Sequence, residues 1–367
     1  MNRTLLWDAA PGEMRAGVVE NGKLAEFRIY RSCWHAGATG SHFTARIIGR
    51  TSNGKPLVDI GGTIEAQLEQ APKLPEGALL AVELVRMPIA EPGRWKLAIV
   101  RPAPDIDMRS AAGPIAADSA MRHFLLPLLE GADRILCGDA LAARDLAGLL
   151  GGKGPPIAID SAALEDADFE GLADQAVRGE FPVEGGLLSV ERTRAMTLID
   201  IDGGGDPLAL NLAAAQQIPR LLRLLDIGGQ VGIDFLALPD RAARQRVDTA
   251  LANACVVLGP HERTATNGFG FAQIVRPRSR PSIPEILCAT TPGRLSVESR
   301  AVALLRQAAR SIGAGTRRIV APPATIDVLR AWPDAVGDAA TLLGYPIELV
   351  SDSSVAGYGH VHVHVQS

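Results

Sequence analysis

Three aspartates stand where apolar segments of strand length end. One segment runs into Asp200 and Asp202, and a second runs into Asp234. Continuous runs of Val, Ile and Leu are typical of buried strands, and an acid at the end of such a strand lies where the sheet meets solvent. Asp200 and Asp202 are two residues apart, so on an extended strand their side chains share one face. Residues 208–226 have a helical pattern, and a strand, a helix and a second strand would bring Asp200 beside Asp234.

A carboxylate pair of this kind could hold a hard divalent cation, because magnesium prefers a few carboxylate oxygens together with water. A water activated by that ion is suited to attack a phosphodiester. Strand-end aspartates also cap turns and helices, and Gly203–Gly205 is a turn signal, so the spacing alone leaves both interpretations open.

Several segments in the same region resemble the ribonuclease E/G family. Ala195–Asp202 resembles the family's "ALTAIDIN", and Asn211–Ala214 resembles its "TNLEAA" helix. Leu221–Phe235 resembles "LRLRDLGGLIVIDF", and Arg263 to Arg278 resembles "RIQIS…FGLLEMSRQR". Because these segments follow one another in the family's order, the resemblance is more specific than any single motif.

The resemblance implies an activity and a set of site residues. The family cleaves single-stranded RNA endonucleolytically, leaving a 5′-phosphate and a 3′-hydroxyl, with magnesium held by the two strand-end aspartates. Asp200 and Asp234 would then be catalytic metal ligands, with manganese as an alternative ion. Asp202 stands where the family has asparagine and would help to orient a ligated water. The residues implied to contact RNA or to brace the site are Asn211, Arg263, Arg276 and Arg278.

The bulk composition indicates a folded protein with more than one domain. The chain has 367 residues, which is longer than the usual chain with a single hydrophobic core. Hydrophobic residues make up 47% of it and charged residues 21%, as is typical of a folded globular protein. No apolar run reaches the roughly 18 residues of a membrane span, and Asp8 interrupts the N-terminal segment too early for a signal peptide. We therefore expect a cytoplasmic protein without a membrane partner.

The chain has no overall excess of positive charge, but its arginines cluster in one stretch. The net charge is −4, yet nine arginines and no lysine fall between residues 220 and 280. The planar guanidinium group suits bidentate contact with phosphate. An arginine bias that merely reflects genome composition explains the same pattern equally well.

The fold expected for the whole chain is a multidomain α/β and α+β arrangement, most of it implied by the resemblance. Residues 1–33 and 114–170 would form a non-catalytic ribonuclease-H-like subdomain. Residues 34–102 would form an inserted OB-fold β-barrel that binds RNA, and residues 171–286 a deoxyribonuclease-I-like catalytic domain. Residues 294–367 would form a small C-terminal α/β domain.

Short alternating strands support the barrel on their own, because recurring strands with turn signals between them suggest an OB-fold. Such barrels stack bases on aromatic side chains above a positive groove. Leu57 stands where the family has an exposed phenylalanine, so RNA binding there should be weak. Arg86 and Lys96 would supply charge, and Trp95 is expected in the core.

Two features of the family are missing from this chain. Residues 103–119 read as a linker where the family carries a sensor for the 5′-monophosphate end of RNA. Cleavage should therefore not depend on the 5′ end of the substrate. The four cysteines lack CxxC spacing, and Cys288 alone remains where the family has the pair that binds a shared zinc. We expect no zinc, and a monomer or a homodimer without a zinc link.

Two classes of function remain for this chain. The first is a magnesium-dependent endoribonuclease that acts on single-stranded RNA in RNA processing or decay. The alternative is a catalytically inactive RNA-binding or assembly protein derived from the nuclease. A nuclease that acts on DNA also stays open, because a fold does not fix its substrate.

Overall fold

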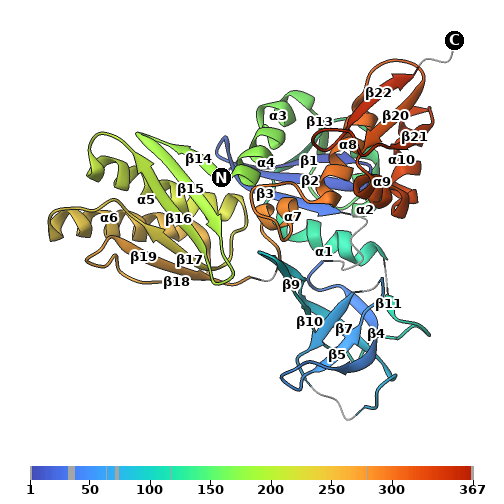
Figure 1. Cartoon of the computed structure of the whole chain (residues 1–367), viewed down its shortest axis with the longest axis horizontal. Helices are drawn as coiled ribbons and strands as arrows, with labels where there is room; N and C mark the ends of the chain where they lie inside the picture. Colours follow the sequence, from blue (N-terminus) through green and yellow to red (C-terminus); the bar gives the residue numbers. More distant parts are fainter. Residues whose placement is uncertain are drawn as a thin grey trace.

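The computed structural model describes residues 2–31, 38–62, 64–70, 74–115, 117–278 and 280–364. Cys33 and the expected boundary between residues 33 and 34 lie outside these residues. The described chain is a mixed α/β structure in which a β-barrel, two larger sheets with helices and a smaller C-terminal sheet lie around a common centre (Figure 1).

The first sheet has the strand order β13-β12-β1-β2-β3. Its N-terminal strands are antiparallel, and β12 and β13 join β1 in parallel. Asn21 and Gly22 take positive φ values of 51° and 78° in the turn between β2 and β3, as an Asn-Gly hairpin requires. The elements are β1 (Arg3–Ala10), β2 (Glu13–Glu20), β3 (Lys23–Arg31), α1 (Ala117–Leu129), β12 (Arg134–Cys137), α2 (Ala140–Leu150), β13 (Ile157–Ile159), α3 (Ser161–Asp166) and α4 (Phe169–Arg178).

The barrel is inserted between β3 and α1. Its strands pair in the cycle β4-β5-β6-β10-β7 and β7 returns to β4, which closes a five-stranded barrel, consistent with the expected OB-fold. A hairpin, β8 with β9, extends from the barrel toward the left-hand sheet of Figure 1. The strands are β4 (His42–Arg50), β5 (Pro56–Asp59), β6 (Glu65–Leu68), β7 (Leu79–Arg86), β8 (Ile89–Glu91), β9 (Arg94–Lys96), β10 (Ala98–Pro102) and β11 (Gly113–Pro114).

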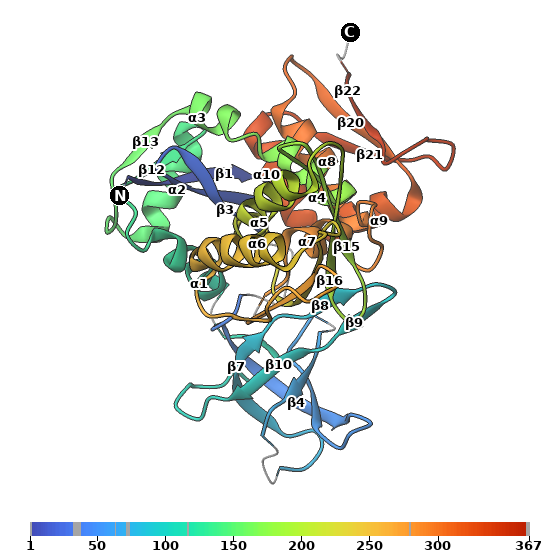
Figure 2. The same ribbon diagram turned by 90° about the vertical axis from the view of Figure 1, so that its left-hand side faces the viewer.

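The third sheet has the order β14-β15-β16-β17-β19-β18. Helices α5 and α6 cover one face, and Figure 2 shows them on one side with β15 and β16 on the other. Helix α5 runs through Pro219 without a break, although an internal proline usually kinks or ends a helix. The elements are β14 (Glu180–Val183), β15 (Gly186–Arg192), β16 (Thr197–Gly203), α5 (Pro207–Leu224), β17 (Gly229–Asp234), α6 (Arg241–Ala254), η1 (Cys255–Leu258), β18 (Glu262–Arg263), β19 (Phe271–Arg276) and α7 (Ile283–Cys288).

The C-terminal part builds the sheet β21-β20-β22. Its histidines, His360, His362 and His364, are exposed on the edge strand. The elements are α8 (Val297–Arg310), β20 (Thr316–Ala321), α9 (Pro323–Ala331), α10 (Pro333–Leu343), β21 (Ile347–Ser351) and β22 (His360–His364).

A buried carboxylate ties the C-terminal part to the first sheet. Glu13 on β2 is fully buried and accepts hydrogen bonds from Arg15 at 2.8 Å, from Arg31 at 2.9 Å and from Arg306 on α8 at 3.4 Å. Burial alone would raise the pKa of Glu13, but the three guanidinium groups outweigh it and lower the pKa to about 2. The carboxylate therefore stays charged and holds three cations that face one another.

We predict that Glu13→Gln lowers the free energy of unfolding by on the order of 3 kcal/mol, because it removes the buried carboxylate that three guanidinium groups share. A carboxyl whose pKa is lowered on folding stabilises the protein above its unfolded pKa of roughly 4.3, and this contribution is lost as the pH falls toward 2. Urea titrations of both proteins at about pH 7 and about pH 2.5 should show the difference shrinking at low pH. The exposed control Glu262→Gln should change little at either pH, and an undiminished effect of Glu13→Gln at low pH would contradict the prediction.

Candidate active site

The acids predicted from the sequence meet on two neighbouring strands. Strands β16 and β17 are parallel, and their register places Asp200 directly opposite Asp234. Ile199, Ile201 and Ile233 alternate with these acids and are buried in the core beneath the helices. Both aspartates therefore point to the other side of the sheet, which we call the open face and which Figure 1 views from the front.

The open face has a regular arrangement of side chains. Asp200 and Asp234, the acid pair, lie between Ser189 on β15 and Phe271 on β19, which are their cross-strand partners. Asp202 shares the face one position further along β16, opposite Leu187. All three aspartates are exposed. Ser189 and Phe271 were not predicted as site residues. Their positions beside the acids depend on the register between strands, which the sequence does not reveal.

The charge on the acid pair is not neutralised by protein groups. Within the described residues, no lysine, arginine or histidine forms an ion pair with Asp200, Asp202 or Asp234. Asp200 Oδ1 accepts a hydrogen bond from the backbone amide of Ile201 at 3.0 Å. Two like charges on adjacent strands, roughly 4.8 Å apart, are a local excess of negative charge that a cation would relieve.

This donor set fits magnesium better than zinc. In the described chain, no group of three or more His, Cys, Asp or Glu side chains is arranged to hold a metal ion, so Asp202 is not brought in as a third ligand. Magnesium is commonly bound by one or two carboxylates and keeps its remaining positions for water and phosphate oxygens. A structural zinc site needs four protein ligands.

Asn211 was expected to contact RNA, but the structure contradicts this because the residue is fully buried. Its side-chain amide donates to the carbonyl of Leu236 at 2.8 Å and accepts from the amide of Leu236 at 3.0 Å. Leu236 lies two residues after Asp234. Asn211 therefore fixes the end of β17 against α5, which is a positioning role.

Arg263 and Arg276 lie on the side of the sheet that the helices cover, away from the acid pair. Arg263 forms a two-pronged ion pair with Asp248 on α6, at 2.7 and 3.2 Å, and its hydrogen bonds lower the pKa of Asp248. Arg276 donates to the carbonyls of Leu222 and Ile227 at 3.0 and 2.8 Å. These contacts brace the sheet against its helices.

Arg278 and Arg86 come together where the barrel meets the third sheet. Arg278 forms an ion pair with Glu285. Burial lowers the pKa of Arg86, and the nearby positive charge of Arg278 lowers it further. The guanidinium group of Arg86 donates a hydrogen bond to the carbonyl of Leu97 at 2.8 Å. We call this region the junction; it lies at the end of β17 opposite to the acids.

The hairpin of β8 and β9 docks at the same junction. Gly93 donates to the carbonyl of Thr290 at 2.9 Å, and Arg194 donates to the carbonyl of Pro92 at 3.1 Å. Lys96 forms an ion pair with Glu91 at 2.6 Å. Trp95 was expected in the core, but its side chain is 56% exposed because it lies on this hairpin instead of inside the barrel.

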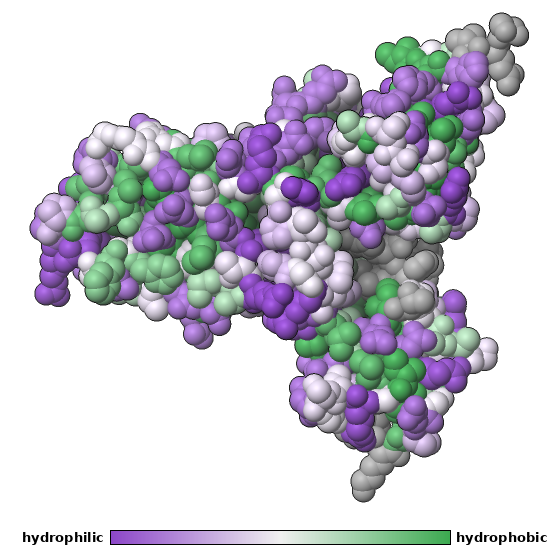
Figure 3. Space-filling model, in the orientation of Figure 1, coloured by the Kyte–Doolittle hydropathy of each residue, from purple (hydrophilic) through white to green (hydrophobic). Residues whose placement is uncertain are grey.

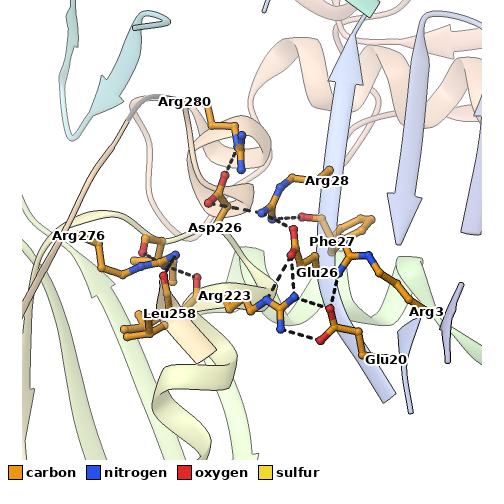
Figure 4. A network of polar contacts seen from close by, with 12 residues as sticks. Arg3, Glu20, Glu26, Phe27, Arg28, Arg223, Asp226, Leu258, Arg276 and Arg280 are labelled. Atoms are coloured by element: carbon orange, nitrogen blue, oxygen red, sulfur yellow. Dashed lines mark hydrogen bonds and ion pairs between the residues drawn. The ribbon is translucent and has the colours of Figure 1, made fainter. Parts of the chain in front are cut away.

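Figure 4 shows that another of the nine arginines is also structural. Arg223 on α5 donates to Glu20 at 2.7 and 2.8 Å and to Glu26 at 2.9 Å, which joins the third sheet to the first. Asp226 lies nearby, between Arg280 and Arg28. The carboxylate partners come from a hairpin some 200 residues earlier in the chain, so the sequence around Arg223 gives no sign of them.

Cys137, Cys255 and Cys288 are free and buried. The described chain has no helix with the length and apolar character needed to cross a lipid bilayer.

Sequence comparison identifies relatives of the part of the chain that holds the acid pair. Residues 163–278 match the model of the Ribonuclease E/G family. Ribonuclease G of Escherichia coli (strain K12) is 35% identical over 120 residues, which are 29% of this chain and 24% of that protein. The chloroplastic Ribonuclease E/G-like protein of Arabidopsis thaliana is 31% identical over 165 residues, 39% of this chain and 16% of that protein. Ribonuclease E of Haemophilus influenzae is 33% identical over 140 residues, 33% of this chain and 15% of that protein. The chain thus matches about a quarter or less of the length of these relatives.

We predict that Asn211→Ala lowers the free energy of unfolding by on the order of 2 kcal/mol, because both backbone polar groups of Leu236 lose their partner. A urea titration would measure the loss. Gln216→Ala is the matched control on the exposed side of α5 and should change stability by less than about 0.5 kcal/mol. Equal stability of the two variants would refute a positioning role for Asn211.

Proposed function

We propose that this chain, of which residues 163–278 match the Ribonuclease E/G family, is a metal-dependent endoribonuclease that cleaves single-stranded RNA. Its role would be in RNA processing or decay. The observation that carries the proposal is the acid pair, two exposed carboxylates in register on adjacent strands without a protein counter-charge. RNA is the substrate class that the names of the relatives support.

Asp200 and Asp234 would hold the ion through their carboxylate oxygens, with Mg²⁺ as the expected ion and Mn²⁺ as the alternative. When bound, such an ion supplies a nucleophilic water at neutral pH and offsets the charge that develops on the phosphate. Asp202 would accept a hydrogen bond from the attacking water and orient it. Cleavage of the bond between phosphorus and the 3′-oxygen leaves a 5′-phosphate and a 3′-hydroxyl.

The strand orders support the expected subdomains, which we retain as part of the proposal. Residues 1–33 and 114–170 would be the ribonuclease-H-like subdomain around an OB-fold at 34–102. Residues 171–286 would be the deoxyribonuclease-I-like catalytic domain, and 294–367 the C-terminal domain. The exposed Trp95, together with Arg86, Arg278 and Lys96 at the junction, would guide RNA between the barrel and the acid pair. No zinc is needed for this arrangement, in a monomer or in a homodimer.

We predict that Asp200→Asn and Asp234→Asn each reduce cleavage of a fluorescent single-stranded RNA by at least about 1,000-fold, with RNA affinity nearly unchanged, because the carboxylates act on the ion and not on the RNA. Removing divalent ions with EDTA should abolish cleavage in the same assay, and Mg²⁺ should restore it. Asp174→Asn, an exposed acid on α4, is the matched control and should cut normally. Cleavage by Asp200→Asn at the unaltered rate would refute the assignment.

Metal-independent RNA binding without any cleavage would favour the inactive RNA-binding alternative. Cleavage of a DNA strand of the same sequence would extend the substrate to DNA.

We further predict that the 5′ end of the RNA does not affect the rate. Between β10 and α1, the described residues form only the short strand β11, which leaves little structure to grip a terminal phosphate. Matched RNAs with a 5′-monophosphate, a 5′-triphosphate or a 5′-hydroxyl should be cut with kcat/KM values within about twofold of one another. A preference of 10-fold or more for the monophosphate would show that another part of the chain senses the end.

A further inference from the structure

An aromatic ring lies beside the acid pair, in a space that a glycine leaves for it. Phe271 is the cross-strand partner of Asp234 on the open face. A Cβ built on Gly232 would lie 2.6 Å from the ring of Phe271, 3.0 Å from the side chain of Leu198 and 3.1 Å from the sulfur of Met196. The ring therefore rests over Gly232 against Leu198 and Met196, one position along the strands from the acids.

The glycine and the ring form a matched pair in this chain. Any side chain larger than hydrogen at position 232 would displace the ring. The flat surface beside the acids thus depends on both residues.

A second aromatic residue lies in the loop immediately before β19. Phe269, two residues before Phe271, is 90% exposed. Its loop is ordered by Asn267, whose side-chain carbonyl accepts from the amides of Phe269 at 2.8 Å and Phe271 at 3.0 Å. Gly270 has a φ of 91° and packs against the carbonyl of Phe235, immediately after Asp234. The loop is thus held in place before any ligand arrives, which lowers the entropic cost of binding.

Two amide side chains lie on the open face next to Phe271 and Gly232. Gln273 lies opposite Gly232 on the open face and donates to Gln230 at 3.3 Å. Both amides carry further donors and acceptors that can meet the edge of a heterocyclic base. Figure 3 shows apolar and polar residues side by side over this sheet. An apolar shelf bordered by amides suits a nucleobase better than it suits an aliphatic or a charged ligand.

We propose that Phe271 and Phe269, with Gln273 and Gln230 at their border, form a base-binding subsite that takes an unstacked nucleobase next to the scissile phosphate. This inference rests on the proposed function, since it places the RNA strand across the acid pair. Aromatic side chains bind the bases of single strands by stacking. Bases paired inside a duplex cannot reach the rings, so the subsite selects single-stranded RNA.

The test uses the full chain without divalent ions, so that binding is measured without cleavage. Fluorescence anisotropy with a short single-stranded RNA should give Kd values about 10-fold higher for Phe269→Ala and for Phe271→Leu than for the unaltered protein. Phe269 is exposed and leucine keeps an apolar side chain over Gly232, so both variants should fold. Val256→Ala, an 80% exposed apolar side chain on η1, is the control and should bind normally.

A series of RNAs with one base removed at each position identifies the contact. One abasic position should weaken binding to the unaltered protein about 10-fold and have little effect on Phe271→Leu, because the contact is already gone. Gly232→Ala should weaken binding like Phe271→Leu, since the added methyl group displaces the ring. Unchanged Kd values in both phenylalanine variants, or an abasic penalty that is the same in Phe271→Leu, would overturn the subsite.

The cleavage assay keeps the two proposals apart. If base-dependent binding is seen and no divalent ion supports cleavage, the subsite stands and the endoribonuclease proposal fails. If cleavage requires Asp200 and Asp234 while the phenylalanine variants bind RNA normally, the endoribonuclease stands and the subsite fails. Equal affinity for a double-stranded RNA of the same sequence would also reject the subsite.

Discussion

The parallel pairing of β16 with β17 is the constraint on which the candidate site depends. The side-chain period of a strand is two, so a slip of one residue would turn Asp234 into the core and leave Asp200 alone on the open face. The register is held from the other side by Ile199, Ile201 and Ile233, which are nearly inaccessible to solvent, and at its end by the two hydrogen bonds between Asn211 and Leu236. The hydrophobic core thus determines how close the two carboxylates lie.

The arginines show how the same residue type divides between structure and function. Arg223, Arg263 and Arg276 are engaged by carboxylates or carbonyls inside the protein, and the planar fork of five donors makes arginine able to satisfy several such groups at once. Arg86 and Arg278 lie at the surface where two parts of the fold meet, and mutual repulsion lowers the pKa of Arg86 after burial does. These two arginines place positive charge at the junction, part of which Glu285 offsets through its ion pair with Arg278.

Local patterns predicted the short strands of the barrel and the strand-end acids, because these features depend on nearby residues, whereas most of the expected domain arrangement was implied by the family resemblance. Local patterns could not predict properties that depend on residues far apart in the chain. The partners of Arg223 belong to the hairpin of β2 and β3, and the burial of Asn211 depends on the segment after β17. Trp95 is exposed because the chain leaves the barrel as a separate hairpin before β10 begins. The ring of Phe271 beside the acids follows from a glycine on another strand, so neither residue indicates the site alone.

The charge distribution separates holding RNA from cutting it. Strand β17 runs from Gly229, next to Arg278 at the junction, to Asp234, a length of roughly 17 Å at the usual rise per residue. A single strand that lies along it meets arginines first and uncompensated carboxylates last. The carboxylates repel phosphate, so close approach there requires a bound cation, whereas the junction and the aromatic rings can hold RNA without one. The junction and the rings would thus bind RNA whether or not the ion is present. The scissile phosphate would lie beside the acid pair only when the cation is bound.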